Sequence, residues 1–389
     1  MQVILQRGKG RRVEDGHPWV YGNEIDTIVG EPKTGDIVEV YNFRNEFIGK
    51  GYINELSQIT VRILTRNKSE NIDEEFFRKK LLECKTYREK LNYTENYRLC
   101  FGEGDFLPAL VIDKFGDIYV IQTLSAGMDK WKSVIVEILL SDFKAKGIYE
   151  RNDVPVRKLE GLEEIKGFLS AEFDTNIVIE ENGVKMHVDL ANGQKTGFFL
   201  DQKENRLAIK NIVKNATILD CFTYTGSFAL FAAHFGAKHV TALDISADAI
   251  EQTKRNVLLN NFDNIECICE NAFDILPLWA KENRLFDVVI LDPPAFTKNR
   301  KGIENAIKGY KEINLRGMKM LKPGGFLVTF SCSHFMDVNL FYDVVSSAAK
   351  DAKKTIREVQ FLTQSKDHPI VWGVEETNYL KGLILEVGT

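Results

Sequence analysis

Two side chains suited to catalysis stand directly after apolar, strand-like runs. Asp292 ends the run VVILD and is followed by two prolines, and Cys332 ends the run in TFSCSHF. Proline fixes its own φ and keeps the preceding residue out of the helical region, so the chain turns rigidly after Asp292. A carboxylate held there can bind a planar base by an amino or ring nitrogen. A helix stop or an edge-strand turn is the alternative explanation of these prolines.

Cys332 suits one reaction in particular, the methylation of cytosine at C5. That carbon is a poor nucleophile, and a thiolate that adds to C6 creates an enamine able to take a methyl group at C5. The thiol must first lose its proton, from a free pKa of about 8.5. A lone cysteine in an apolar strand is more often inert core. Cys332 differs because it lies between two serines, past the apolar part of its strand, and we interpret the other five cysteines as core residues.

The loop LDCFTYTGSFA predicts a nucleoside site between a strand and a helix. Asp220 ends the strand, and Gly226 stands at the turn before a helix that begins near Ser227. A dinucleotide site needs three glycines so that the backbone can approach a pyrophosphate, and the single glycine here disfavours NAD and FAD. An acidic strand end, a tight turn and a helix N-terminus suit a nucleoside that carries an amino acid and no phosphates.

Two further loops are placed to contact such a nucleoside. Asp244 ends the strand HVTALD, and an acid at about this distance beyond the first loop can accept hydrogen bonds from ribose hydroxyls. Capping of the helix that begins at Ala247 is the alternative, and the two roles can coexist. After the strand IECICE, Asn271 or Asp274 could meet an adenine amino group, although both residue types are common in loops.

Strict alternation of strand and helix positions these residues from about residue 192 onward. Short apolar runs rich in β-branched and aromatic residues alternate with segments whose apolar residues have helical spacing. This pattern predicts a parallel sheet with helices on both faces and a ligand site at the carboxyl ends of the strands. Two adjacent strand ends would then bring Cys332 close to Asp292.

Upstream of this α/β region the pattern changes twice. From residue 1 to about residue 67, short alternating runs separated by Gly, Pro or Asn predict a small antiparallel barrel. Residues 73–93 have helical spacing and are followed by strand-like runs, which predicts a compact α+β domain. We therefore expect three domains, at residues 1–70, 71–188 and 189–389.

Basic residues and aromatic rings are interleaved near the N-terminus, in RGKGRRVEDGHPWVYGNEI. This composition suits RNA, because cations bind phosphates while rings stack on unpaired bases. Arg11, Arg12 and Trp19 are the candidate contacts, and Lys298 and Arg300 after the Asp292 loop are two more. A solvated basic segment with Trp19 in the barrel core, and a solvated loop after Asp292, are the alternatives.

The composition is that of an ordered globular protein. Of 389 residues, 44% are hydrophobic and 28% are charged, and 9 are prolines. Six cysteines are too few for a disulfide framework, so we expect a reducing cytoplasm. The N-terminus is too charged for a signal peptide, and no apolar run reaches the roughly 20 residues of a membrane helix. The net charge of −5 offers no general attraction to a polyanion, so RNA must be held by local basic patches.

Together these motifs resemble a known family, the bacterial S-adenosylmethionine-dependent methyltransferases that form 5-methylcytosine in large-subunit (23S) ribosomal RNA. The resemblance rests on residues 220–226, Asp244, DPPAF and SCS. It covers essentially the full length through the segments RRVEDGHPWVYGNEI, RNDVPVRKLEGL, NGQKTGFFLDQ, GYKEIN, DHPI and YLKG. It implies an N-terminal PUA domain, a central α+β domain, and a C-terminal class I methyltransferase domain with a Rossmann-like, seven-stranded, mostly parallel sheet.

The resemblance also implies roles for individual residues. Cys332 matches the family's nucleophile, Asp292 matches the aspartate that positions the cytosine, and the KTGFFLDQ segment is implied to pack beside the methionine end of the cofactor. The family usually has aspartate where this chain has Asn271, whose amide oxygen can still accept from the adenine amino group. The implied cofactor-pocket residues are Lys195, Thr196, Gly197, Phe198, Asp201, Gln202, Asp220, Phe222, Thr223, Gly226, Asp244, Ile245, Asn271, Ala272 and Asp292.

The sequence therefore predicts a cytosine-C5 methyltransferase that uses S-adenosylmethionine, needs no metal and acts on 23S rRNA or a large-subunit precursor. One alternative is methylation of an exocyclic amine on an RNA purine, which needs no nucleophile. Another is a non-catalytic RNA-binding factor of ribosome assembly. The base that removes the C5 proton, the target nucleotide and the formation of a homodimer are left open, and we expect no membrane association.

Overall fold

The computed structural model describes residues 1–297 and 300–388. Its contacts divide the chain into two compact units, each assembled from three stretches of sequence. Unit 1 comprises Met1–Ile179, Val188–Leu200 and Lys366–Thr377, and unit 2 comprises Glu180–His187, Asp201–Ser365 and Asn378–Thr389. The three-domain boundaries expected from the sequence stay a prediction. No helix in the described ranges has the length and apolarity needed to cross a bilayer.

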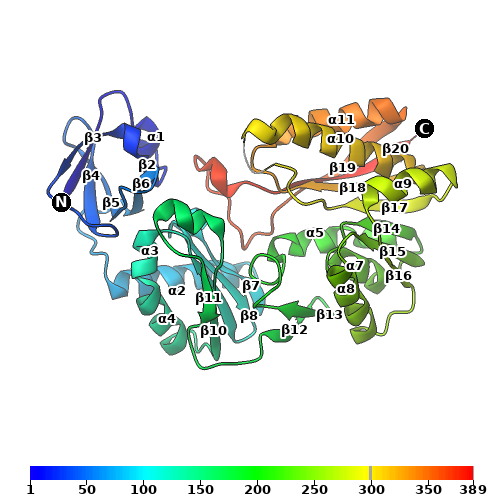
Figure 1. The fold of residues 1–389 in the computed structure, drawn as a ribbon, viewed down its shortest axis with the longest axis horizontal. Coiled ribbons are helices and arrows are strands. Elements are labelled where there is room, and N and C mark those ends of the chain that lie inside the picture. The colour runs from blue at the N-terminus through cyan, green and yellow to red at the C-terminus, as the bar shows by residue number, and fades with distance from the viewer. Residues whose placement is uncertain (298–299, 389) are drawn as a thin grey trace. The chain divides into compact units, whose positions relative to one another are not determined.

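Unit 1 begins with a six-stranded sheet in the order β2-β6-β5-β4-β1-β3 (Figure 1). All of its pairs are antiparallel except β1 with β4. Its apolar side chains, such as Val40 and Val61, pack into one core. The elements are β1 (Gln2–Leu5), α1 (Arg11–Glu14), β2 (Trp19–Tyr21), η1 (Gly22–Glu24), β3 (Ile25–Val29), β4 (Ile37–Tyr41), β5 (Phe47–Ile53) and β6 (Ile59–Thr65).

A five-stranded sheet with helices follows in the same unit, in the order β11-β10-β9-β8-β7. Asp73 caps the first helix by accepting a hydrogen bond from the Phe76 backbone N–H at 3.0 Å, and Phe76, Phe77 and Leu81 bury its apolar face. The elements are α2 (Glu74–Lys90), β7 (Asn96–Phe101), η2 (Gly102–Asp105), β8 (Leu110–Phe115), β9 (Ile118–Thr123), α3 (Ala126–Lys130), α4 (Lys132–Ser141), β10 (Gly147–Asn152), η3 (Pro155–Glu160) and β11 (Ile165–Phe168).

Side chains of the six-stranded sheet enter the core of the five-stranded one. Tyr52 of β5 is buried in that core, and its hydroxyl donates to the Pro108 carbonyl at 2.8 Å. A Cβ on Gly127 would lie 2.0 Å from the Tyr52 ring, so only glycine permits this close approach. Arg62 of β6 pairs with Glu160 at 2.8 Å, and both side chains are buried. The two sheets of unit 1 are thus joined by apolar and ionic contacts.

Unit 2 is built on a seven-stranded sheet in the order β16-β15-β14-β17-β18-β20-β19 (Figure 1). The first five strands are parallel, and β20 pairs antiparallel with both β18 and β19. The predicted Rossmann-like, mostly parallel sheet is confirmed. Its strands are β14 (Thr217–Cys221), β15 (His239–Asp244), β16 (Ile265–Cys269), β17 (Phe286–Leu291), β18 (Leu321–Ser331), β19 (Thr355–Thr363) and β20 (Lys381–Gly388).

Helices cover both faces of this sheet. α7 and α8 contact β14, β15 and β16 on one face, while α9, α10 and α11 pack together with β17, β18 and β19 on the other (Figure 1). The helices are α5 (Lys203–Ala208), α6 (Lys210–Val213), α7 (Ser227–His234), α8 (Ala247–Leu259), α9 (Ala272–Lys281), α10 (Ile303–Lys319) and α11 (Val338–Ala352). The short elements are β12 (Asn176–Glu181), β13 (Val184–Asp189), η4 (Leu200–Gln202), η5 (Arg300–Gly302) and η6 (Glu375–Thr377). This arrangement brings the carboxyl ends of five parallel strands to one edge.

Candidate active site

Asp220, in the centre of the sheet, secures the first loop. It is the last residue but one of β14. Its Oδ2 accepts from the Thr223 hydroxyl at 2.5 Å and from the Ala229 backbone N–H at 3.0 Å. Its other oxygen, Oδ1, is buried and has no hydrogen-bond partner among the described residues. A buried acceptor left without a donor is costly, and it marks a place for a ligand's donor or cation.

The loop after Asp220 has an unusual backbone. Phe222, Tyr224 and Gly226 all have positive φ, at 62°, 50° and 86°. The backbone N–H groups of Thr223, Tyr224 and Gly226 donate within the protein, to the Leu243 carbonyl, the Asp244 carboxylate and the Thr223 carbonyl, so these bonds hold the tight turn before α7. A Cβ on Gly226 would lie 2.6 Å from Thr253 Cγ2, so this turn requires glycine. The single glycine found in the sequence therefore shapes the loop.

Asp244 braces the same loop from the neighbouring strand. Its Oδ2 accepts from the Tyr224 backbone N–H and its Oδ1 from the Ser246 backbone N–H, both at 2.9 Å. Ser246, and not Asp244, caps α8, because the Ser246 hydroxyl accepts from the Ala249 backbone N–H. The alternative of Asp244 as a helix cap is therefore wrong, and its prediction as a ribose ligand stays open. The next side chain, Ile245, is 68% exposed.

Asn271 is the last residue of the third loop and immediately precedes α9. Its Oδ1 accepts from the Phe273 backbone N–H at 3.0 Å, which makes Asn271 the helix cap, and Ala272 after it is buried. The amide oxygen that was expected to meet adenine is thus already engaged once. Its second lone pair and its amide donors are the groups that can serve a ligand.

Asp292 follows β17 and belongs to a short chain of polar side chains. Its Oδ2 accepts from Gln202 Nε2 at 3.0 Å, and Gln202 Oε1 accepts from Asn205 Nδ2 at 2.6 Å. Asp201, beside Gln202, accepts from the Tyr379 hydroxyl at 2.5 Å. The structure thus brings two residues of the KTGFFLDQ segment, Asp201 and Gln202, into unit 2, and Gln202 to the Asp292 carboxylate.

Three carboxylates interact at this edge of the sheet. The pKa of Asp220 is raised to about 7, chiefly by burial and also by the negative charges of Asp292 and Asp244, against the hydrogen bonds from Thr223 and Ala229. A buried acid with like charges nearby and no cation gains from a positively charged ligand. S-adenosylmethionine carries a sulfonium and an ammonium, so the residues present fit this cofactor.

Cys332 follows β18, which pairs in parallel with β17, so the thiol and Asp292 follow adjacent strand ends. Cys332 is half-buried, while the serines on either side of it are buried. The Tyr310 hydroxyl lies 3.1 Å from Ser333 Oγ, and Lys381 Nζ donates to the Ser333 carbonyl at 2.6 Å. The two residues thus follow neighbouring parallel strands, as predicted, while the proximity of the thiol to Asp292 and its chemical role stay predictions.

Two residues near Cys332 were missed in the sequence. Lys381 is 3% exposed, and burial lowers its pKa to about 8, while Cys332 and Asp337 act in the opposite direction. Burial likewise raises the pKa of Tyr310 to about 12, with Cys332 adding to the rise. Lys381 stands in the YLKG segment, but nothing in a sequence distinguishes a buried lysine from a solvated one. The spacing of apolar residues in α10 assigns Tyr310 only to the core.

The first four candidates of the KTGFFLDQ segment, Lys195, Thr196, Gly197 and Phe198, belong to unit 1. Thr196 is buried and donates to Asp113 at 2.5 Å, and Phe198 is also buried. Lys195 is exposed, with its ammonium 4.6 Å from the centroid of the Phe199 ring. The roles implied for these four residues in the cofactor pocket stay predictions.

The candidate RNA contacts differ in exposure. Arg11 is 91% exposed, whereas Arg12 donates to the Trp19 carbonyl and lies 5.0 Å from the centroid of the Tyr21 ring. Trp19 is half-buried outside the barrel core, and its indole N–H donates to Glu103 at 2.8 Å. The alternative that places Trp19 in the barrel core is therefore wrong. Lys298 lies outside the described residues, and Arg300 begins η5.

The remaining cysteines are not all core residues. Cys84, Cys100 and Cys221 are buried as expected, but Cys267 is half-buried and Cys269 is exposed, which corrects the interpretation of those two. β16 is an edge strand of the seven-stranded sheet, and an edge strand is covered less completely than a central one. The interpretation failed there because apolar composition does not reveal a strand's place in the sheet.

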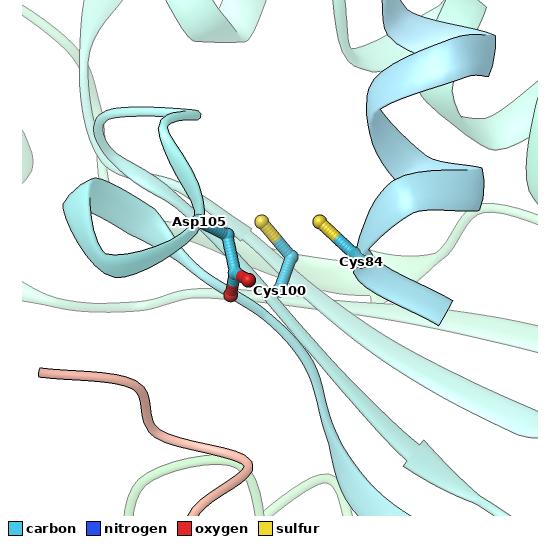
Figure 2. A group of neighbouring side chains, drawn as sticks. All are labelled: Cys84, Cys100 and Asp105. Atoms are coloured by element: carbon cyan, nitrogen blue, oxygen red, sulfur yellow. The ribbon is translucent and has the colours of Figure 1, made fainter. Parts of the chain in front are cut away.

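Figure 2 shows the one group of potential metal ligands among the described residues, Cys84, Cys100 and Asp105, whose ligand atoms lie within 4.8 Å of one another. The Asp105 carboxylate already accepts from the Arg88 guanidinium, at 2.7 Å from Nη2, and from the Phe101 backbone N–H. A hydrogen bond with Cys100 and burial raise the pKa of Cys84, which favours the protonated thiol. These contacts make the group a structural part of the core of unit 1.

The comparisons with known proteins agree with this geometry. A family model for a PUA-like domain matches residues 3–66, and one for an S-adenosylmethionine-dependent methyltransferase matches residues 162–385. The proteins named Ribosomal RNA large subunit methyltransferase I from Pseudoalteromonas translucida and Shewanella denitrificans are 42% and 41% identical to this chain. The matches cover 99% and 100% of this chain and 99% of each relative.

Solved structures share the fold at lower identity. A methyltransferase complexed with SAH has a TM-score of 0.85 at 21% identity, with 99% of this chain and 100% of that chain covered. A SAM-dependent methyltransferase from Streptococcus mutans has a TM-score of 0.83 at 20% identity, with the same coverage.

The sheet order, the acids at its strand ends and the tight loop after β14 define a class I methyltransferase. The chain belongs to the S-adenosylmethionine-dependent methyltransferase family that includes the proteins named Ribosomal RNA large subunit methyltransferase I. It is an enzyme, and S-adenosylmethionine is its cofactor. The resemblance seen in the sequence, the predicted fold class and the predicted cofactor are confirmed.

Proposed function

We propose that this enzyme methylates C5 of a cytosine in large-subunit (23S) ribosomal RNA, with Cys332 as the nucleophile. The observation that carries the proposal is the position of Cys332 and Asp292 after adjacent parallel strands, at the edge where the cofactor loops gather. The relatives' printed names supply the class of RNA. The PUA-like barrel supports an RNA substrate, with Arg11, Arg12, Trp19, Lys298 and Arg300 as proposed contacts.

The cofactor is proposed to lie over the loops after β14, β15 and β16. The orphaned Oδ1 of Asp220 would accept from the ammonium of its amino-acid end, and Asp244 would accept from its ribose hydroxyls. Asn271 would contact its adenine. When bound, the cofactor supplies an electrophilic methyl group. The other proposed pocket residues are Lys195, Thr196, Gly197, Phe198, Asp201, Gln202, Phe222, Thr223, Gly226, Ile245, Ala272 and Asp292.

Two residues have separate proposed roles at the substrate: Asp292 binds the base, and Cys332 adds to it. Asp292, oriented by Gln202, would accept from the exocyclic amine of cytosine and hold the ring in place. The Cys332 thiolate would add to C6, the resulting enamine would take the methyl group at C5, and loss of the C5 proton would release the thiolate. The buried ammonium of Lys381 beside Cys332 would favour the thiolate over the thiol.

The test is methyl transfer from labelled S-adenosylmethionine to rRNA from cells that lack the gene, followed by mass spectrometry of the nucleosides. We expect 5-methylcytosine from the wild type and none from Cys332→Ala, while Cys269→Ala, which removes an exposed thiol, stays active. An N-methylated purine, or full activity of Cys332→Ala, would contradict the cysteine mechanism. RNA binding without any methyl incorporation would favour the assembly-factor alternative.

A second measurement isolates the covalent step. RNA that carries 5-fluorocytidine has no C5 proton to lose, so the adduct with Cys332 should persist after methyl transfer. We expect a protein–RNA band that resists denaturation with the wild type and with Cys269→Ala, and no such band with Cys332→Ala. A band of equal intensity with Cys332→Ala would assign the nucleophile to another residue.

The form of the substrate and the assembly state complete the proposal. Naked 23S rRNA and a large-subunit precursor are both to be offered in the methylation assay, and the better substrate identifies the stage at which the enzyme acts. A cytoplasmic location follows from either substrate. A homodimer is tested by sedimentation of the purified chain.

A further inference from the structure

Unit 1 contains a cavity of about 370 Å³ that the proposed reaction does not use. Its walls come from the end of β6, from α2, from the η2 turn and from the segment Lys366–Thr377. Two exposed aromatic rings, Trp372 and Phe106, line it together with Arg66, Lys80 and Glu103. Pockets that hold one small ligand begin at about 300 Å³, so the space admits a single nucleotide-sized group.

Trp372 is the most exposed large side chain of the protein's described hydrophobic residues, at 95%. An indole held in water gains free energy when a partner covers it, and tryptophan is typical of the central residues of binding sites. The Phe106 ring, at the same cavity, is 59% exposed and its backbone has a positive φ of 59°. A non-glycine residue in this strained conformation is more common at functional sites than elsewhere.

The segment that carries Trp372 is fastened to unit 1 at both ends. At its start, Asp367 Oδ2 accepts from the Arg98 backbone N–H at 2.8 Å, and the Asp367 carbonyl accepts from Arg88 at 2.6 Å. At its end, Glu376 lies 3.0 Å from His17 Nε2. These contacts fasten the backbone of the loop that carries the exposed ring, and a loop that is already ordered loses little entropy when a ligand binds.

Charge at the cavity favours an anion on one side. The Arg66 guanidinium donates to the carbonyls of His17 and Ile48, at 3.1 and 3.4 Å, and forms no ion pair in the described part of the chain. Glu103 adds an acceptor, whose Oε1 is held by the Trp19 indole N–H. A guanidinium with no carboxylate suits a phosphate, and a carboxylate suits the exocyclic amine of a base.

We propose that this cavity binds one unpaired nucleotide of the RNA substrate, with its base on Trp372 and Phe106 and its phosphate on Arg66. Ring faces stack on any unpaired base, and a cation at the edge of the platform holds the backbone. Glu103 then favours adenine, cytosine or guanine over uracil, which has no exocyclic amine. Trp19 acts as a positioning residue, because its indole N–H orients Glu103. The inference rests on the proposed function for its RNA substrate and on the contacts of unit 1 for its site.

Fluorescence anisotropy of a labelled ten-nucleotide single-stranded RNA of mixed sequence tests the proposal with the full-length protein. We expect Trp372→Ala to raise Kd about tenfold, Trp372→Phe to recover part of the loss, and Leu159→Ala to leave Kd unchanged. Leu159 is the matched control, because it is 70% exposed in unit 1 and does not line the cavity. Equal Kd values for Trp372→Ala and the wild type would overturn the proposal.

Three further binding experiments test whether the cavity recognises a phosphate, an exocyclic amine and an unpaired base. Arg66→Gln should reduce the salt dependence of log Kd by about one phosphate contact, whereas Lys146→Gln, which removes a charge paired with Asp117, should leave it unchanged. An oligouridine should bind more weakly than an oligoadenosine or oligocytidine, and Glu103→Gln should reduce that difference. A duplex RNA that binds as tightly as the single strand and loses as much with Trp372→Ala would refute base stacking.

The methylation assay separates this inference from the proposed function. With rRNA as substrate, Trp372→Ala should raise KM several-fold and leave kcat unchanged, because the ring lies outside the residues assigned to the reaction. A wild type that binds RNA through Trp372 but transfers no methyl group would defeat the proposed function and leave the cavity's role intact. A wild type and a Trp372→Ala variant with equal KM and equal Kd would defeat the cavity's role alone.

Discussion

Two buried carboxylates, one in each unit, differ in whether a positive charge pairs with them and in the direction of their pKa shift. In unit 1, Asp113 is fully buried and accepts two hydrogen bonds from Arg98 at 2.8 Å, and although burial alone would raise its pKa, Arg98 and Thr196 hold it below the usual value. In unit 2, Asp220 is equally buried, has no arginine, and has a pKa raised to about 7. The cost of desolvation at Asp113 is compensated by Arg98 within the fold. At Asp220 it is not, so a cationic ligand can compensate it.

This difference separates structural charges from functional ones. Arg88 with Asp105 and Arg98 with Asp113 join segments of unit 1 and have their charges paired inside the fold. Arg62 is likewise paired in charge with Glu160, although its buried Nε has no hydrogen-bond partner among the described residues. Asp220, Asp244 and Asp292 lie near one another with no cation described between them, which raises the energy of the free enzyme and favours a cationic cofactor. Burial alone therefore does not mark a site, whereas a buried charge without an internal counter-charge does.

Removal of an arginine in unit 1 should have the largest effect. Arg98→Leu leaves Asp113 buried and unpaired, and we expect a loss of about 3 to 5 kcal/mol in the free energy of unfolding, measured by urea denaturation. The double variant Arg98→Leu with Asp113→Leu should recover much of the loss. Arg11→Leu, which breaks an exposed pair with Asp15, should change stability by less than about 1 kcal/mol. Equal losses for the two single variants would contradict the comparison.

Asp220→Asn should increase the free energy of unfolding relative to the wild type, whereas Arg98→Leu should decrease it. Between pH 3.8 and about 7 the folded protein binds a proton at Asp220 that the unfolded chain has released, so the wild type loses stability as the pH rises through this range. The Asn variant lacks this loss, and its stability relative to the wild type should increase by at most about 4 kcal/mol from pH 4 to pH 8. It should also bind S-adenosylmethionine more weakly.

Asp287 provides the control for this titration. Burial would raise its pKa, but hydrogen bonds from Thr217 and Lys322 lower it below the usual value. Asp287→Asn should therefore lose stability relative to the wild type as the pH rises toward 3.8, and the difference should stay nearly constant above pH 4. Thermal unfolding measured from pH 4 to pH 8 should show a relative stability that rises for Asp220→Asn and stays nearly constant for Asp287→Asn. Curves with the same slope for the two variants would refute the assignment of the raised pKa to Asp220.

Lys381 extends the comparison to a cation. Its ammonium donates to two carbonyls, those of Ser333 and Tyr379, and forms no ion pair within the described residues. The negative charges that raise its pKa against burial are those of Cys332 and Asp337. Lys381→Met should slow iodoacetamide alkylation of Cys332 about tenfold at pH 7. Lys381→Arg should retain part of the rate.

The pH dependence of this alkylation has a defined sign. Because the pKa of Lys381 is about 8, its charge is lost as the pH rises through 8, and the advantage of the wild type over Lys381→Met should shrink there. Mass spectrometry of the peptides gives the Cys332 rate, and Cys269, which is exposed, serves as the internal reference. An unchanged ratio of the two rates in Lys381→Met would refute the role of the ammonium.

The smallest effect is expected at Asn271. Asn271→Asp keeps the cap of α9, because Asn and Asp cap helices about equally, and adds a charged acceptor for the adenine amino group. We expect calorimetry to show binding of S-adenosylmethionine that is tighter by about threefold or less. Weaker binding would show that an additional acid at this edge outweighs the hydrogen bond, and would remove Asn271 from the adenine site.

Periodicity predicted the part of the site that depends on strand ends. Asp220, Asp244, Asp292 and Cys332 were found because a parallel sheet places the carboxyl ends of its strands at one edge, whatever the details of packing. The conformation of the loop after Asp220 was beyond prediction, since its alternate positive φ angles depend on the hydrogen bond that the Tyr224 backbone N–H donates to Asp244 and on contact with Thr253.

Residues defined by distant contacts were missed for the same physical reason. Lys381 and Trp372 belong to residue types that occur in both buried and exposed positions, and only the packing around each one determines its exposure. Trp19 was predicted to contact RNA or to fill the barrel core. It lies outside that core and donates to the Glu103 carboxylate in the η2 turn, while its contact with RNA stays a prediction. Sequence spacing carries no information on a partner 84 residues away.

The return of Lys366–Thr377 to unit 1 also affects the order in which the chain can fold during synthesis. Arg88 and the Arg98 backbone N–H obtain partners from Asp367, 279 and 269 residues later in the chain. Until the ribosome has made that segment, the N-terminal unit keeps buried donors without acceptors, and contacts of such long range form slowly. Unit 1, although it starts the chain, is therefore completed only near the end of translation.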